Sequence, residues 1–202
     1  SRYAPLVNAS QVHNQTTGDR LHLRPRLSMT LERPWGYVRP AASIWHTQYN
    51  LENEVFAIES KPSISASLFS IDSGLTFERE YRTETESYTQ TLEPRLLLLS
   101  AQADEQGDTP LFDSSQLDFS YYNLFHETGW SGNDRIADTQ QATLGLSSAM
   151  YSDQGIEKLR LGAAQAYYFK DRDHPALRPG DLTGQESTSN LATLASNAKY
   201  LE

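Results

Sequence analysis

The segment 21–32 alternates strictly between apolar and polar residues. Its odd positions hold leucine, methionine or proline, and its even positions hold histidine, arginine, serine, threonine or glutamate. Successive side chains of a β-strand point to opposite faces, so this period of two predicts one apolar face and one ionic face. Strands of soluble proteins usually run to only about five or six residues. A longer strand with a charged face is typical of a transmembrane β-barrel, with lipid outside and water inside.

Composition restricts how this chain could meet a membrane. The longest uninterrupted aliphatic run is Leu96–Leu99, whereas a membrane-spanning helix needs about 20 apolar residues. Any membrane-spanning part is therefore expected to consist of strands. The formal net charge of −9 argues against general binding of nucleic acid, which requires a basic face. The start of the chain carries no signal peptide, so we expect a fragment or processed product of an exported protein.

Further alternating segments predict an up-and-down antiparallel arrangement. We expect strands at 20–33, 37–49, 63–80, 88–101, 138–151 and 156–170, and the beginning of another at 190–200. Short connections at 34–36, 81–87 and 152–155 alternate with long ones at 50–62, 102–137 and 171–189, as in outer-membrane barrels. An apparent change of phase near Phe69-Ser70 predicts a β-bulge.

The predicted fold class is all-β. We expect residues 1–202 to be a segment of one antiparallel transmembrane β-barrel domain, a wall fragment of a large up-and-down outer-membrane barrel. Closed transmembrane barrels begin at about eight strands, so these strands are too few to close alone.

No catalytic or metal-binding constellation is recognisable. The chain has no cysteine, and no two of its five histidines stand at metal-ligand spacing. A nucleophile elbow, a phosphate loop and a zinc motif are all missing from the sequence. We therefore expect no enzyme activity, no catalytic residue, no bound metal and no cofactor.

Five short sequence blocks follow one another along the chain. They are Arg20–Pro25, Tyr88–Arg95, Asp113–Ser115, Asp134–Ile136 with Gln141–Gly145, and Tyr167–Phe169. Together they resemble the mid-barrel region of the LptD family, the outer-membrane lipopolysaccharide translocon of Gram-negative bacteria. The resemblance covers roughly residues 1–169, and beyond Asp171 we find no matching motif.

The resemblance implies a barrel that inserts lipopolysaccharide into the outer leaflet and holds an LptE-type plug lipoprotein in its lumen. The expected partners are this plug lipoprotein, lipopolysaccharide and outer-membrane lipid, without nucleic acid, and the expected location is the bacterial outer membrane. The family's periplasmic jellyroll, gate strands and disulfide cysteines match nothing in this segment. Two other interpretations stay open: a wall segment of another outer-membrane barrel, such as a porin or receptor, and a soluble β-sandwich binding module.

The alternation also predicts which side chains face water inside the barrel. The lumen-facing candidates are His22, Arg24, Arg26, Glu32, Glu93 and Arg95, and the lipid-facing ones are Leu23, Leu27, Leu31, Leu96, Leu98, Leu144 and Leu146. The arginines could form a basic track for the phosphates of a glycolipid. They could instead form cross-strand pairs with Glu32 and Glu93 in a wet lumen, and this second interpretation is the favoured one.

The connection 102–137 is the largest predicted excursion and is expected on the extracellular side. The strands on either side run in opposite directions, so it must contain an even number of full strands, or none. It is too rich in aromatic residues for a freely solvated loop. Either it folds inward onto the plug, with its base fixed by Asp134 and Arg135, or it forms a local hairpin near 117–125. For the first case, the plug-contact candidates are Phe112, Phe125, Trp130, Asp134 and Arg135.

Overall fold

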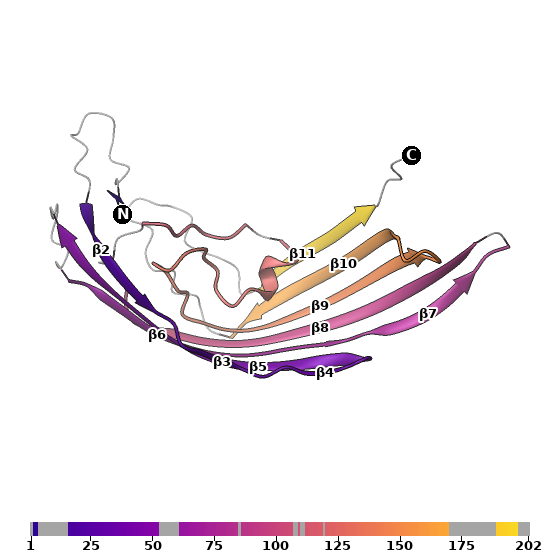
Figure 1. The fold of residues 1–202 in the computed structure, drawn as a ribbon, viewed down its shortest axis with the longest axis horizontal. Helices are drawn as coiled ribbons and strands as arrows, with labels where there is room; N and C mark the ends of the chain where they lie inside the picture. Colours follow the sequence, from indigo (N-terminus) through magenta and orange to yellow (C-terminus); the bar gives the residue numbers. More distant parts are fainter. Residues whose placement is uncertain are drawn as a thin grey trace, which may run out of the picture.

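The computed structural model describes residues 2–3, 16–52, 61–84, 86–106, 109, 112–118, 120–169 and 189–197. They form one antiparallel sheet that curves into an open trough (Figure 1), with the strand order β1-β2-β5-β6-β8-β9-β10-β11. The strands are β1 (Arg2–Tyr3), β2 (Thr16–Leu23), β3 (Arg26–Ser28), β4 (Leu31–Arg33), β5 (Gly36–Glu52), β6 (Ser63–Leu75), β7 (Phe77–Arg82), β8 (Ser87–Ala103), β9 (Thr139–Ser152), β10 (Glu157–Tyr168) and β11 (Ser189–Asn197). One short 3-10 helix, η1, spans Asn123–Phe125.

The first predicted hairpin is confirmed. β2, β3 and β4 all pair with β5 in a single register, so they follow one path that is interrupted at Arg24-Pro25 and at Met29-Thr30. Pro25 has no N–H to donate, but its carbonyl still accepts a hydrogen bond from the amide of Ile44 at 3.2 Å. The alternation therefore continues through the proline, as the sequence predicted.

The β-bulge predicted near Phe69-Ser70 is wrong. β6 pairs with β5 in one constant register over its whole length, and β7 continues the register of β6 against β8. Apolar residues change face along β6 for another reason. Ile64 and Leu68 are buried on the concave face, where another segment covers them, whereas Phe69 is exposed on the convex face.

The expected pairing of β8 with β9 is confirmed, from Tyr88 opposite Ser152 to Ala101 opposite Thr139. The described residues between these strands contain only η1 and one isolated bridge, so they contain no full strand, in agreement with the expected parity. β11 pairs with β10 and confirms the expected strand near 190–200. The loops predicted at 50–62 and 171–189 lie largely outside the described residues.

The convex face of the sheet is apolar and exposed. Nothing among the described residues covers its large side chains, which include Leu21, Leu23, Leu27, Leu31, Ile44, Phe69, Leu98, Leu144, Leu146 and Leu161. Six of the seven leucines predicted on the lipid side are exposed there, and Leu96 is half-buried. No helix in the described part of the chain is long and apolar enough to cross a membrane.

The concave face holds the buried core, because the connection between β8 and β9 folds back over it (Figure 1). We call residues 104–138 the covering segment; its described residues are 104–106, 109, 112–118 and 120–138. Each of three buried clusters joins strand residues to this segment, through Tyr121, Leu124 and Phe125, through Ile136, or through Phe112. A sheet one layer thick thus acquires an interior on one side only.

Candidate functional site: the concave face and its covering segment

Asp134 is the centre of the network that fastens the covering segment to the sheet. Its side chain is fully buried, and its Oδ1 accepts hydrogen bonds from the Arg20 guanidinium at 2.5 Å and the Tyr49 hydroxyl at 2.8 Å. Its Oδ2 accepts from the backbone amides of Phe112 and Asp113 at 2.8 and 2.9 Å. One carboxylate therefore joins β2, β5 and both ends of the covering segment.

Asp113 pairs with the same guanidinium from the solvent side. Both terminal nitrogens of Arg20 donate to its carboxylate, at 2.8 and 2.6 Å. These hydrogen bonds, together with the positive charge of Arg20, hold the pKa of the Asp113 carboxyl well below its usual range. Arg20 is thus shared between a buried carboxylate and an exposed one.

At the end of the covering segment, the side chains of Gln106 and Arg135 form hydrogen bonds with backbone groups that lie outside the strands. The Gln106 amide donates to the carbonyl of Ile136 at 2.7 Å, and its oxygen accepts from the Ile136 amide at 3.0 Å. The guanidinium of Arg135 is buried and donates to the hydroxyl and the carbonyl of Thr109 and to the carbonyl of Asp134. These bonds satisfy polar groups that would otherwise be costly to bury.

Aromatic residues of the covering segment fill a notch in the sheet. Phe125 lies against Gly145, where an added Cβ would come within 2.6 Å of its ring. The ring also contacts Leu97, which is 1% exposed, and the guanidinium of Arg95 lies over it at 4.3 Å from its centroid. Tyr121 packs beside Phe125 with ring centroids 5.6 Å apart. Docking of this segment thus depends on a missing side chain in β9.

Glu127 connects the covering segment to the arginines of the first strands. Both of its oxygens accept hydrogen bonds from Arg26, one of them also accepts from the Ser70 hydroxyl at 2.6 Å, and Arg24 approaches to 3.5 Å. Burial alone would raise the pKa of the Glu127 carboxyl. The hydrogen bonds from Arg26 and Ser70 and the charges of both arginines outweigh burial and bring the pKa below its ordinary 4.5.

Further ion pairs lie on the concave face, both between strands and within one strand. Arg95 on β8 donates from two nitrogens to Asp72 on β6, at 2.9 and 3.0 Å. Arg160 on β10 donates to Glu93 on β8 at 3.1 Å and to Glu157 at 2.9 Å.

The sequence favoured cross-strand pairing of Arg24, Arg26 and Arg95 with Glu32 and Glu93. Arg95 does form a cross-strand pair, but with Asp72. Arg26 pairs instead with Glu127 of the covering segment, which Arg24 also approaches.

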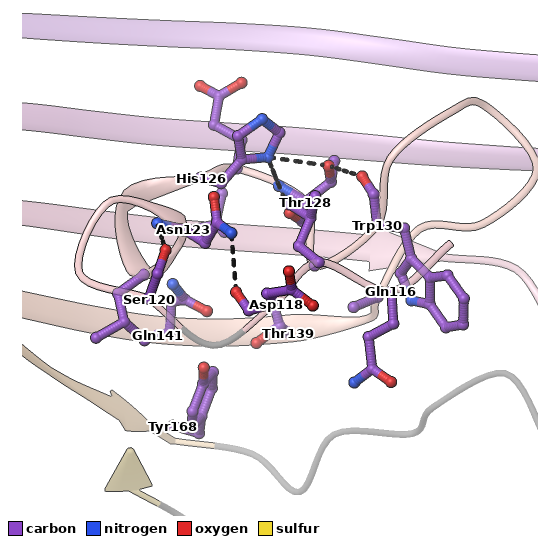
Figure 2. A pocket seen from close by; sticks show the side chains of 16 residues that line it. Gln116, Asp118, Ser120, Asn123, His126, Thr128, Trp130, Thr139, Gln141 and Tyr168 are labelled. Carbon is purple, nitrogen blue, oxygen red and sulfur yellow. Dashed lines mark hydrogen bonds between the residues drawn. The ribbon is translucent and has the colours of Figure 1, made fainter. Parts of the chain in front are cut away.

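A cavity of about 110 Å³ lies between the covering segment and the ends of β8, β9 and β10 (Figure 2). Its polar groups bond mainly within the segment. The backbone amide of Thr128 donates to His126 Nδ1 at 3.3 Å, and the side-chain amide of Asn123 donates to the Asp118 carbonyl at 2.8 Å. No cluster of potential metal ligands occurs among the described residues. The cavity is therefore a polar gap under a folded loop, and nothing in its lining suggests a reaction.

All six lumen-facing candidates lie on the concave face. His22 bonds to the Thr47 hydroxyl at 2.7 Å, and Glu32 stands opposite Tyr37, whose hydroxyl donates to Asp72 on the same face. That this face lines a barrel lumen stays a prediction.

The plug-contact candidates are mostly turned toward their own sheet. Phe125, Trp130, Asp134 and Arg135 are buried within the chain, and Phe112 is half-buried beside Tyr49. The second interpretation, a hairpin near 117–125 that extends the wall, does not match η1 and the inward packing of this stretch. Contact with a plug stays a prediction, but burial already gives these five residues a structural role.

Sequence reasoning missed three contributors to this site. The sequence offered no partner for Glu127, Gly145 appeared only as the last residue of a family block, and Tyr49 appeared only as the end of the predicted strand 37–49. The available signal was the apolar character of Leu97 and Leu99 at inward positions, since side chains of that kind in a wet face require a cover.

Comparison with known proteins identifies the family. The sequence model of LptD, described as LPS transport system D, matches residues 4–200. The chain belongs to the LptD family. An LPS-assembly protein LptD of Alcanivorax borkumensis is 45% identical over 78% of this chain, and relatives of the same name from Ectopseudomonas mendocina and Pseudomonas aeruginosa are 36% and 37% identical over 93% and 83%. These matches cover 21%, 22% and 19% of the relatives, so the chain spans about a fifth of their length.

The LptD family match extends further than the sequence motifs indicated. It continues to residue 200, past the predicted limit at 169, and therefore includes β11. Three of the blocks that carry the LptD resemblance meet in space. Arg20, Asp113 and Asp134 come from separate blocks and form the network that fastens the covering segment.

Proposed function

We propose that the chain is a wall segment of an outer-membrane β-barrel that takes part in the insertion of lipopolysaccharide into the outer leaflet. The observation that carries this proposal is a single curved sheet with an apolar, uncovered convex face and a charged concave face, in a member of the LptD family. The role is one of transport and assembly, without catalysis. The site of action is the bacterial outer membrane.

Strand length supports a membrane-spanning wall. A strand needs about 9–11 residues to cross the hydrocarbon core. β5 and β8 have 17 residues each, β9 has 14 and β10 has 12. The strands are therefore long enough to cross and to project beyond the membrane.

The exposed convex face disfavours a soluble β-sandwich. Such a module would bury its apolar face against a second sheet. Here Leu27 is 80% exposed and Leu144 is 63% exposed. In a membrane both leucine side chains would contact the apolar lipid chains instead of water. A porin or receptor segment is disfavoured by membership of the LptD family.

We place the excursion predicted at 102–137 on the extracellular side of the lumen and propose that its outward surface meets an LptE-type plug lipoprotein. Tyr122 is 60% exposed, and Gln116, Asp118 and His126 of the same segment are exposed as well. Phe125 and Trp130 would then act indirectly, by holding the segment in position beneath the contact. An exposed tyrosine among polar groups is a common type of interface residue.

Photo-crosslinking in cells tests both parts of the proposal. A photo-reactive amino acid is placed at Leu144 or at Tyr122 of the full-length protein. We expect lipid adducts from Leu144, and adducts with the plug lipoprotein or lipopolysaccharide from Tyr122. Protein adducts alone at Leu144 would refute the membrane wall. Adducts of Tyr122 with neither partner in an intact complex would refute the assigned surface.

A further inference from the structure

Four arginines converge on a second cavity of the concave face. The cavity has a volume of about 270 Å³ and lies beside the covering segment, where Phe125 and Leu97 form its apolar wall. The guanidinium groups that line it belong to Arg24, Arg26, Arg39 and Arg95. Arg24 lies between β2 and β3, Arg26 belongs to β3, Arg39 to β5 and Arg95 to β8, so the fold brings the charge of β8 to those of the first hairpin.

Among the described residues, only two carboxylates line the same cavity, and each is already engaged by one arginine. Glu127 accepts hydrogen bonds from both terminal nitrogens of Arg26. Asp72 accepts from Nε and Nη2 of Arg95. Such two-bond pairs are the strongest arrangement open to a guanidinium and a carboxylate. The available negative charge is thus largely committed to Arg26 and Arg95.

Arg24 and Arg39 are left with weak partners. Arg24 reaches Glu127 through one contact of 3.5 Å, and Arg39 comes no closer to Asp72 than 4.0 Å. Among the described residues, the only hydrogen bond of the Arg39 side chain runs from Nε to the hydroxyl of Thr30 at 3.3 Å. The side chains of Arg24 and Arg39 are 33% and 47% exposed, so their donors remain accessible from the cavity.

Four positive and two negative side chains leave the cavity with a surplus charge of about +2, in a chain whose formal net charge is −9. Aromatic rings restrict where these charges can move. Arg24 lies over the Trp45 ring at 4.2 Å and Arg95 over the Phe125 ring at 4.3 Å from the centroid. Guanidinium groups held in this way lose less conformational freedom when they bind an anion.

We propose that this cavity binds a phosphate-type oxyanion, held by Arg24 and Arg39. A doubly charged oxyanion matches the surplus charge, and its oxygens can accept paired hydrogen bonds from guanidinium groups. The phosphate can be a free ion or part of a phosphorylated glycolipid. Its assignment to a glycolipid rests on the proposed function, whereas the site itself does not.

Binding is tested on the full-length protein in detergent, in phosphate-free buffer at low salt. Inorganic phosphate and glucose 1-phosphate are titrated by calorimetry, with glucose as the uncharged blank. We expect saturable binding of the phosphate compounds, weakened by salt. The double variant Arg24→Gln/Arg39→Gln should bind at least about tenfold more weakly. The matched control Arg33→Gln/Arg79→Gln removes the same charge at exposed positions outside the cavity and should stay within about twofold.

The outcomes separate the site from its cargo. Absence of saturable phosphate binding by the wild-type protein would overturn the site, as would an equal loss of binding in both double variants. Neither result bears on the proposed function, which the photo-crosslinking at Leu144 and Tyr122 tests separately. Tighter binding of glucose 1-phosphate than of inorganic phosphate supports a phosphorylated sugar as the source. Tighter binding of inorganic phosphate supports the free ion. If the Arg24→Gln/Arg39→Gln protein loses binding and yet delivers lipopolysaccharide normally to the cell surface, the assignment to glycolipid is overturned.

Discussion

Replacement of Asp134 by alanine should detach the covering segment from the concave face. Among the described residues, the substitution removes the only carboxylate that bonds to both the Arg20 guanidinium and the buried Tyr49 hydroxyl. It also removes the acceptor of two backbone amides, those of Phe112 and Asp113. All of these groups lie where water cannot readily replace the lost oxygen atoms, since the Asp134 side chain is fully buried.

The size of the effect follows from these contacts. Loss of one partner of a buried ion pair costs about 3–5 kcal/mol. Arg20 keeps its bonds to Asp113 after the substitution, so the lower end applies to the charge. The unsatisfied hydroxyl and amides add about 1–3 kcal/mol each while they stay buried. The segment limits this cost by opening to water, and we therefore expect about 3 kcal/mol, or an increase of more than about 100-fold in the open population.

Asp113→Ala is the matched control, because it removes the other carboxylate bound to the same guanidinium. Its side chain is 48% exposed, and exposed pairs contribute about 0–1 kcal/mol. Hydrogen exchange of peptides from 112–137 in the full-length protein measures the opening. Fast exchange in Asp134→Ala with near wild-type exchange in Asp113→Ala is the expected result. Equal exchange in the two variants would refute a buried hub at Asp134.

Other substitutions test the wall and the fastening separately. Leu27→Arg should cost about 2–4 kcal/mol of folding free energy in lipid vesicles if residue 27 lies near the membrane midplane. Ser28→Arg on the concave face should be nearly neutral. Equal costs for the two substitutions would contradict the assignment of the two faces. Gly145→Val should displace the Phe125 ring and cost about 1–3 kcal/mol in protection of the covering segment, whereas Gly129→Ala has no neighbour within 4 Å of the added Cβ and should leave exchange unchanged. The pKa of Glu127 is lowered in the folded state, so its stabilising contribution is present above about pH 4.5 and is lost as the pH falls through the folded pKa. Proteolysis of the segment should therefore accelerate in acid, and in Glu127→Gln this dependence on pH should flatten.

Much of the wall could be predicted from sequence because its information is local. A period of two assigns each side chain to a face before any partner is known. The continuous register of β2, β3 and β4 against β5 follows from the alternation in 21–32. The family blocks then indicated what kind of barrel the sheet belongs to, although family membership extends beyond the last block.

The covering of the concave face could not be predicted in the same way. Ile64, Leu68 and Leu97 are apolar at inward positions, and alternation alone reads such residues as a bulge or as an interruption of polarity. Their cover comes from residues more than 20 positions away, in a segment without regular alternation. The Asp134 network likewise joins side chains up to 114 positions apart, so no local pattern announces it.

The glycine at 145 bears on the order in which such a wall is assembled. A single-layer sheet in an aqueous compartment has no interior to hold its strands together before lipid receives its other face. Where Phe125 enters the notch at Gly145, β8, β9 and β10 gain an apolar nucleus that is made from their own connection. We therefore expect these three strands to associate around that nucleus early in folding, ahead of strands that have no such cover.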